Sequence, residues 1–294
     1  MAVRFDDIGN RLKAFRLASG LAADEIARRL GISRAALYRF ERGELVKIET
    51  LEKLSELLRV SVPTLLGVGV EYLPSAVAYF ERLRQVEETA SHIIVLAGPI
   101  SYLLASPEFH QRLAGILTES IPDTADDRKR AQSDVAQVMA ILAQRKETYR
   151  QRRPGIVNLL AASEVGRLLQ NGLTGRFDLP ERQRRQRRAH ARAEVEHLLS
   201  LMQEQPMDVQ IGLVPDTLPH TGFQIFRQPD REVLSVSPFR LGEHPNVQVG
   251  VAMMTSAPEA LALHHRTVTT MWRRASKGAA AVRRMKELLA LYKK

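Results

Sequence analysis

The sequence of 294 residues contains no cysteine, and aromatic residues make up only 5% of it. The absence of cysteine excludes a disulfide framework, a thiolate metal site and a cysteine nucleophile. The shortage of aromatic side chains favours a helix-rich aliphatic core over an aromatic-rich β-sandwich. Because 45% of the residues are hydrophobic, the chain can still bury a sizeable core, and its length predicts two domains.

Long apolar runs are also missing from the sequence. Nowhere do about 18 apolar residues follow one another without a charge, so we expect no membrane span. The first residues, MAVRFDDIGNRLKAF, lack the apolar core of a signal peptide. We therefore expect a cytoplasmic protein with no membrane partner.

Acidic residues are in deficit, with 33 Asp and Glu against 43 Lys and Arg and a net charge of +10. This balance points to nucleic acid or another polyanion as a partner. The excess is uneven, because residues 1–66 carry 12 basic and 9 acidic side chains, whereas residues 145–192 carry 13 and 4. Most of the positive charge therefore lies outside the first 66 residues.

Helical periodicity and end signals predict five short helices in the first 66 residues. In the segment GISRAALYRFERGE, residues 31–44, Ser33 is suited to cap the third helix and Gly43 to end it. Leu37 and Phe40 would hold this helix to the core. Its other side would then face outward.

Beyond the helical head the pattern changes. A Gly- and Pro-containing junction at 68–75 precedes expected helices at 76–97, 106–120 and 125–150. Helices ending at Gly172 and starting at Pro180 follow an expected strand, IVNLLA. Four strand-like runs, DVQIGLVP, GFQIFRQ, EVLSVSP and NVQVGVAMM, precede a final helix at 258–292. We predict a mostly α chain with a five-helix head at 1–67, a junction at 68–75, a helical dimerisation segment at 76–150, and an α/β effector-binding or regulatory domain with a mixed sheet at 151–294.

The head carries a pattern of small, apolar and acidic residues along residues 21–66: Leu21, Glu25, Ile26, Ala27, Leu30, Gly31, Ser33, Leu37, Phe40, Glu41, Gly43, Leu51, Leu54, Leu58 and Leu66. By these residues the head resembles the Cro/lambda-repressor (XRE-type) helix-turn-helix family. The resemblance implies a five-helix domain that sets its third helix into the major groove of double-stranded operator DNA. It places the base-contacting positions at Arg34, Ala35 and Arg39.

Arginine is the natural bidentate partner of guanine, and alanine can touch a thymine methyl. Tyr38, Arg42 and Lys47 are better placed for phosphate. The predicted DNA-binding residues are Ser33, Arg34, Ala35, Tyr38, Arg39, Arg42 and Lys47. The head departs from the family where Ala23 replaces the usual Gln, which removes a phosphate contact, and where Val46 replaces a frequent Pro.

The rest of the chain is similar to an uncharacterised domain that follows XRE heads in many actinobacterial regulators. The similarity rests on FERLRQVEETASHI, GPISYLLASPEFHQRL, LLSLMQEQPMDVQIGLVP and GFQIF. It implies a domain for sensing or assembly, and we expect a homodimer whose contacts come from the helices of 76–150.

An effector, if there is one, is expected in a pocket lined by the strands of 208–252 and the last helix. The candidate contacts are His220, Arg227, Arg240 and Trp272, and the expected effector is an anionic or amphipathic small molecule. The alternative is that these arginines are solvated and the nearby aromatic residues belong to the core.

Two further clusters allow more than one interpretation. The run ERQRRQRR, residues 181–188, spreads its arginines around a helix, which favours a solvated surface over a second contact with DNA or an acidic ligand. His190 and His197 are seven residues apart, with Glu194 between them. This spacing fits a surface ion-pair cluster better than a metal site.

No catalytic motif is present: a phosphate-binding loop, a Gly-x-Ser-x-Gly turn and a complete dinucleotide loop are all absent. We therefore expect no enzyme, no cofactor and no bound metal. The leading hypothesis is a sequence-specific DNA-binding transcriptional regulator that responds to a small molecule. An antitoxin-type autorepressor that binds a protein partner, and an enzyme fused to a helix-turn-helix head, remain as alternatives.

Overall fold

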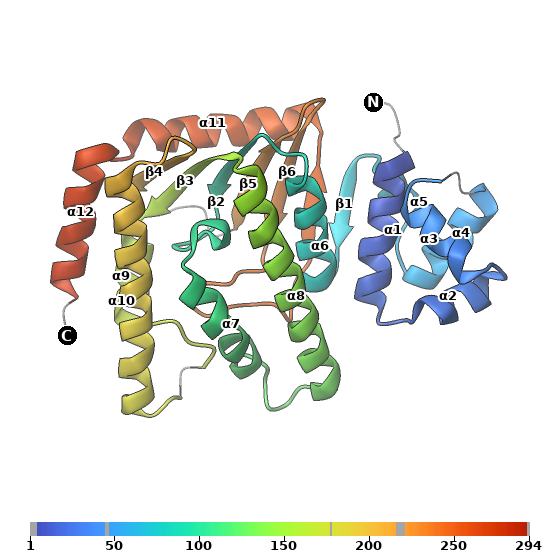
Figure 1. The fold of residues 1–294 in the computed structure, drawn as a ribbon, viewed down its shortest axis with the longest axis horizontal. Helices are drawn as coiled ribbons and strands as arrows, with labels where there is room; N and C mark the ends of the chain where they lie inside the picture. Colours follow the sequence, from blue (N-terminus) through green and yellow to red (C-terminus); the bar gives the residue numbers. More distant parts are fainter. Residues whose placement is uncertain (1–4, 45–46, 177, 216–220, 293–294) are drawn as a thin grey trace.

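The computed structural model describes residues 5–44, 47–176, 178–215 and 221–292. A small helical head, residues 5–66, lies at one end, and a larger α/β body, residues 70–292, lies beside it (Figure 1). The chain is mostly helical and carries one mixed sheet in the body. The predicted fold class is confirmed.

Five helices form the head: α1 (Phe5–Ser19), α2 (Ala23–Leu30), α3 (Arg34–Glu41), α4 (Ile48–Leu58) and α5 (Val62–Leu66). Their ends follow the sequence signals. α2 ends at Gly31, whose φ of 67° is a left-handed conformation that side chains disfavour. α3 begins after Ser33, whose Oγ accepts a hydrogen bond from the amide of Ala36 at 3.1 Å. Local sequence therefore fixes where α3 starts.

Close packing of α1 against α3 fixes how α3 is presented. Leu12 of α1 and Leu37 of α3 are each only 1% exposed in the core of the head. Gly9 of α1 lies against the backbone of α3, because a Cβ added there would be 2.6 Å from the carbonyl oxygens of Phe40 and Glu41. Only glycine allows this approach.

The body is built on a seven-stranded mixed sheet with the order β1-β7-β6-β5-β2-β3-β4. β2, β3 and β4 are parallel, and the remaining neighbours are antiparallel. The strands are β1 (Val70–Leu73), β2 (His92–Leu96), β3 (Gly155–Ala161), β4 (Val209–Val214), β5 (Gly222–Arg227), β6 (Glu232–Ser237) and β7 (Ala252–Thr255).

Helices cover both faces of this sheet (Figure 1). The larger core lies under α6 (Ala76–Glu87), α7 (Pro107–Glu119), α8 (Arg128–Arg152), α9 (Ala162–Asn171), α10 (Glu181–Glu204) and α12 (Gly278–Leu291), with a short 3-10 helix at Tyr102–Leu104. The smaller core lies on the other face, under α11 (Pro258–Arg274). In the described parts of the chain, no helix combines the length and apolar character needed to cross a membrane.

Several expected elements differ from the observed ones. The expected helix at 76–97 is wrong beyond residue 87, because His92–Leu96 forms strand β2 inside the sheet. The expected junction at 68–75 contains the edge strand β1. The expected final helix is broken at Ser276, whose backbone bonds to Leu213 of β4. Strands from 70–96 and from 155–255 share one sheet, so the segment 76–150 is not a separate helical unit.

The helices of 76–150 also lack the surface that we expected for dimerisation. Eleven of the twelve residues of α6 are buried. Within 76–150, all of which the structure describes, no large apolar side chain is exposed. The apolar faces of these helices are buried inside the body. Their packing therefore does not support the expectation that they form a dimer interface.

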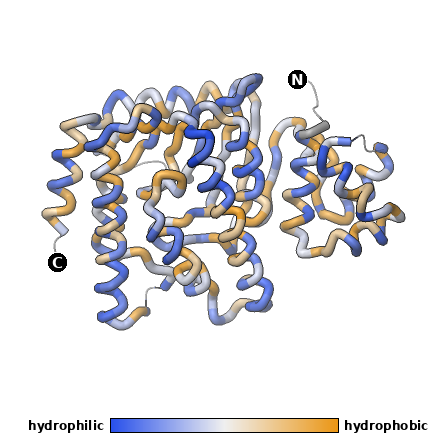
Figure 2. The backbone as a smooth tube through the Cα atoms, viewed as in Figure 1, coloured by the Kyte–Doolittle hydropathy of each residue, from blue (hydrophilic) through white to orange (hydrophobic). Residues whose placement is uncertain are grey.

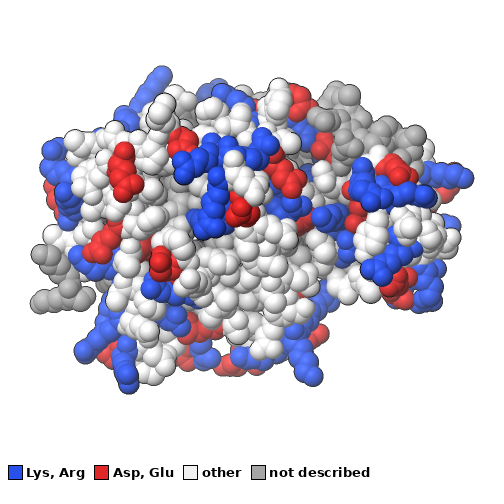
Figure 3. Space-filling model, in the orientation of Figure 1, with Lys and Arg blue, Asp and Glu red and all other residues white. Residues whose placement is uncertain are grey.

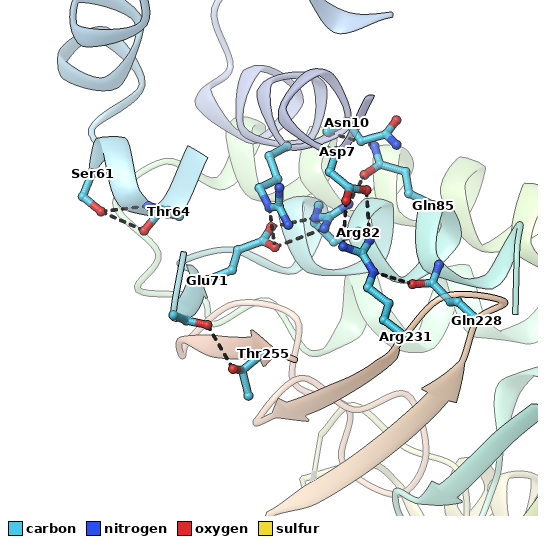
Figure 4. Close-up of polar contacts among 12 residues, drawn as sticks. Asp7, Asn10, Ser61, Thr64, Glu71, Arg82, Gln85, Gln228, Arg231 and Thr255 are labelled. Atoms are coloured by element: carbon cyan, nitrogen blue, oxygen red, sulfur yellow. Dashed lines mark hydrogen bonds and ion pairs between the residues drawn. The ribbon is translucent and has the colours of Figure 1, made fainter. Parts of the chain in front are cut away.

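Buried ion pairs hold the head against the body (Figure 4). Glu71 of β1 accepts hydrogen bonds from Arg11 of α1 at 3.0 Å and from Arg82 of α6 at 2.6 and 3.1 Å. All three side chains are at most 7% exposed. A third, half-buried pair joins Asp7 of α1 to Arg231, in the turn between β5 and β6, at 2.7 Å.

We predict that Gly9→Ala destabilises the chain by about 1–3 kcal/mol, because the added methyl forces α1 away from α3. Gly115→Ala in α7 is the matched control: apart from its chain neighbours and the backbone of its own helix, no atom of the described residues lies within 4 Å of the added Cβ. In an exposed helix this change is expected to stabilise by about 0.5–1 kcal/mol. Urea unfolding of both variants measures the two effects. Equal stability of the two variants would contradict the close approach at Gly9.

Stability is also expected to depend on the charge of Glu71. Burial acts to raise the pKa of Glu71, but Arg82 and Arg11 outweigh it and hold the pKa below its usual value. A carboxylate with a lowered pKa in the folded state stabilises the fold above the unfolded pKa of about 4.5. This contribution is lost as the pH falls below that value.

The measurement is the free energy of unfolding from neutral pH down to about pH 3. Glu71→Gln is expected to be less stable at neutral pH and to lose less stability on acidification than the unmodified chain. Glu52→Gln, on the exposed side of α4, is the control and should retain the full pH dependence. If Glu71→Gln shows that same dependence, the ion pairs of Glu71 do not carry it.

Candidate nucleic-acid interface and effector site

The outward face of α3 presents the residues that the sequence singled out. Ser33, Arg34, Ala35 and Arg39 are exposed, and Tyr38 is half-buried. Leu37, on the opposite side of the helix, is buried. Arg42 and Lys47, just beyond α3 and just before α4, are also exposed. All seven predicted DNA-binding residues therefore lie on or next to one helix.

The two arginines of this face form only solvent-exposed ion pairs. The Arg34 guanidinium lies 3.4 Å from Asp24, and Arg39 lies 3.2 Å from Glu44. Arg34 also donates to the Tyr38 hydroxyl, which raises the pKa of this arginine. Exposed pairs of this kind contribute little to stability. Both guanidinium groups can thus exchange their carboxylate for a phosphate or a base at small cost.

The other polar groups of the interface are also available to a nucleic acid. Among the residues that the structure describes, no carboxylate lies within 4.0 Å of Arg42 or Lys47. The Oγ of Ser33 accepts the cap hydrogen bond, and a serine hydroxyl can donate its proton at the same time. On the visible face of the molecule, basic and acidic side chains are interspersed (Figure 3).

Sequence reasoning missed a pair that supports this face from behind. Glu41, on the inner side of α3, is 9% exposed and forms an ion pair with Arg16 of α1. The same guanidinium lies 5.7 Å from the centre of the Tyr38 ring. The signal was present, because Glu41 follows Leu37 by four residues and so shares its buried side.

The four predicted effector residues do not come together. Arg227 is exposed at the end of β5 and pairs with Glu232 at 3.1 Å. Trp272 lies on α11, on the other face of the sheet, with Lys277 5.1 Å from its ring centre. His220 lies outside the described residues. Trp272 lines a cavity of its own, together with residues 209–211 of β4 and Gly278 at the start of α12. The predicted effector residues therefore do not share one pocket.

Arg240 does line a cavity, but a different one. The cavity has a volume of about 320 Å³ and lies beside α6, at the carboxyl end of β2. Its walls are α6, the segment 97–103, α8, α9, the near ends of β5 and β6, and the segment 237–246. We call it the α6 cavity. Its size falls at the lower end of small-molecule sites, which hold about 300–1,000 Å³.

The arginine run lies far from α3. It forms the N-terminal end of α10, which is strongly hydrophilic and is on the opposite side of the body from the head (Figures 1 and 2). Arg184, Arg185 and Arg188 pair with Glu181, and Arg187 pairs with Glu119. These contacts fit the interpretation of the run as a partly neutralised, solvated helix.

The expected His–Glu surface cluster is not formed. Glu194 is 2% exposed and accepts hydrogen bonds from the amide and hydroxyl of Ser106. A ring nitrogen of His197 lies 3.0 Å from the carbonyl oxygen of Leu104. Among the described residues, no three His, Asp or Glu side chains gather as a metal site requires.

Comparison with protein families matches residues 12–65 to a family model described as helix-turn-helix. The match spans the head from α1 to α5 and leaves the body outside it. A search of curated proteins with the whole chain finds no match. The similarity of the body to the domain that follows XRE heads stays a prediction. The head therefore matches a helix-turn-helix domain, the kind of domain by which many regulators bind DNA.

Proposed function

We propose that this protein is a sequence-specific DNA-binding transcriptional regulator. The observation that carries the proposal is the outward face of α3, where Arg34, Ala35 and Arg39 are exposed on a helix pinned by Leu37. A helix presented in this way fits the major groove of DNA, which is about 12 Å wide. The helix-turn-helix match supports the same use of α3.

Each of the seven predicted DNA-binding residues has a chemical role in this proposal. Arg34 and Arg39 donate to the O6 and N7 acceptors of guanine, and Ala35 contacts a thymine methyl. Ser33, Tyr38, Arg42 and Lys47 donate to phosphates, which set the register of the protein on the duplex but carry no sequence information.

The proposal extends to the assembly and to the body. Helix-turn-helix regulators bind two half-sites about one helical turn apart, so we propose a homodimer. The body would bind an anionic or amphipathic effector, and we propose Arg240, which lines the α6 cavity, as its contact. No catalytic step is part of this function.

We predict that Arg39→Ala lowers the preference for operator over unrelated DNA by about 1–3 kcal/mol, because a guanine contact is lost. Arg42→Ala, which removes a phosphate contact, should weaken binding to both DNAs alike and reduce the salt dependence. The measurement is a competition gel shift at fixed salt, with an operator selected from random duplexes.

Arg284→Ala in α12, at the end of the body away from the head, is the control for loss of charge alone (Figure 1). It should leave the preference unchanged. If Arg39→Ala also keeps the full preference, Arg39 does not contact bases. If no operator can be selected at all, the proposed function is wrong.

The selected operators also test the homodimer. We expect an inverted repeat with half-sites about 10 base pairs apart, bound by two chains. Sedimentation of the full chain with and without this DNA measures the stoichiometry. One chain on a single half-site would contradict the dimer while leaving DNA recognition by α3 intact.

A further inference from the structure

The α6 cavity has the walls of a site for an aromatic ligand. Tyr79, Phe80, Tyr102 and Phe239 all line it, and each is at most 7% exposed. The ring centres of Tyr79 and Phe239 are 5.7 Å apart, and those of Tyr79 and Phe80 are 5.1 Å apart. These rings therefore pack on one another and together form an aromatic wall, against which the ring of a ligand can pack.

The charges of the cavity are paired with one exception. Three arginines line it, and two have their own carboxylates: Arg145 donates to Glu87 at 2.7 and 2.9 Å, and Arg167 donates to Glu243 at 3.0 Å. Among the described residues, no carboxylate lies within 4.0 Å of Arg240. This guanidinium is the cavity's free positive charge.

Arg240 is held in place without using all of its donors. Its backbone exchanges two hydrogen bonds with Asn246, at 3.0 and 3.1 Å, and its Nε donates to the carbonyl of His244 at 3.0 Å. The two terminal nitrogens are therefore left for a bidentate contact with a carboxylate. Glu164 and Glu243 also line the cavity and disfavour an occupant with several negative charges.

We propose that the α6 cavity binds a small aromatic monocarboxylate, with its carboxylate on Arg240, and that α6 relays this binding to the head. The first part names the effector class, and the second names its route to DNA. Both rest on the proposed function as a DNA-binding regulator.

α6 is suited to this relay because the cavity and the head touch different sides of the same helix. Tyr79, Phe80 and Leu83 line the cavity. Arg82 shares Glu71 with Arg11 of the head.

A hydrogen bond also joins α6 directly to α1, because the Gln85 side chain donates to the backbone carbonyl of Asn10 at 3.0 Å (Figure 4). α6 is almost wholly buried, and a packed interior transmits displacement instead of absorbing it. A ligand that shifts α6 therefore moves the contacts that hold α1, and with them α3.

Calorimetry of the full chain tests the ligand class. The probes are benzoate and indole-3-acetate, their uncharged amides benzamide and indole-3-acetamide, and acetate, which has the charge without the ring. We expect at least one aromatic carboxylate to bind, and its amide and acetate to bind at least about tenfold more weakly. Arg240→Ala should weaken the carboxylate about tenfold or more. Arg227→Ala, an exposed arginine outside the cavity, should not.

The DNA arm uses the selected operator. The bound carboxylate should change operator affinity by about fivefold or more, in either direction. Gln85→Ala should keep carboxylate binding and lose most of this change, because it removes the direct bond between α6 and α1. Thermal unfolding of each variant confirms that it is folded.

The outcomes separate the claims. If neither aromatic carboxylate binds, the ligand class is wrong. It is also wrong if the amides bind as tightly as the carboxylates, or if the Arg240→Ala variant binds the carboxylates as tightly as the unmodified chain does. If a carboxylate binds through Arg240 but operator affinity is unchanged, the relay is wrong. If the affinity changes equally in Gln85→Ala, the relay does not run through the Gln85 hydrogen bond. In both cases operator selection by the free protein still stands, whereas a failure to select any operator contradicts the regulator itself.

Discussion

Glu71 is the residue on which the arrangement of head and body depends. Its buried carboxylate accepts from Arg11 of the head and from Arg82 of α6, so one charge ties together α1, β1 and α6. A buried charge is costly unless it is matched, and removing one partner of such a pair costs about 3–5 kcal/mol. The head is therefore docked on the body at a buried polar contact, and the helix beside it, α6, also forms a wall of the α6 cavity.

Elements were predictable from the sequence where their signals lie within a few neighbouring residues, and they were missed where the structure depends on residues far apart in the sequence. The head was predictable because its signals are local: Ser33 caps α3, Gly31 ends α2 and Leu37 marks the buried side. β2 was missed because its five residues follow α6 after a four-residue turn, and a short apolar run looks the same in a helix or a strand. Only its partners β3 and β5, which lie far away in the sequence, make it a strand.

The two candidate sites differ in the same respect: one is built from neighbouring residues and the other from distant segments. The DNA-binding residues lie within one helix and its flanks, so helical periodicity alone placed Arg34 and Arg39 on the outward face. The α6 cavity is assembled from α6, α8, α9, the segments 97–103 and 237–246 and the near ends of β5 and β6, and no sequence pattern joins them. Arg240 was singled out because it comes just after an expected strand, EVLSVSP, which is a local feature of the sequence. Arg227 also lies at a strand end, but it is the end of β5 that is remote from the cavity, and there Arg227 pairs with Glu232 of β6.

Whether head and body form one rigid unit is measured most directly by the distance between spin labels on each part. The chain has no cysteine, so Ala35→Cys on α3 and Ala140→Cys on α8 give two unique exposed attachment sites. A head held by Glu71, Arg11 and Arg82 predicts a single narrow distance distribution, which broadens when Glu71→Gln is added. A broad or multiple distribution in the otherwise unmodified chain would contradict the docked arrangement.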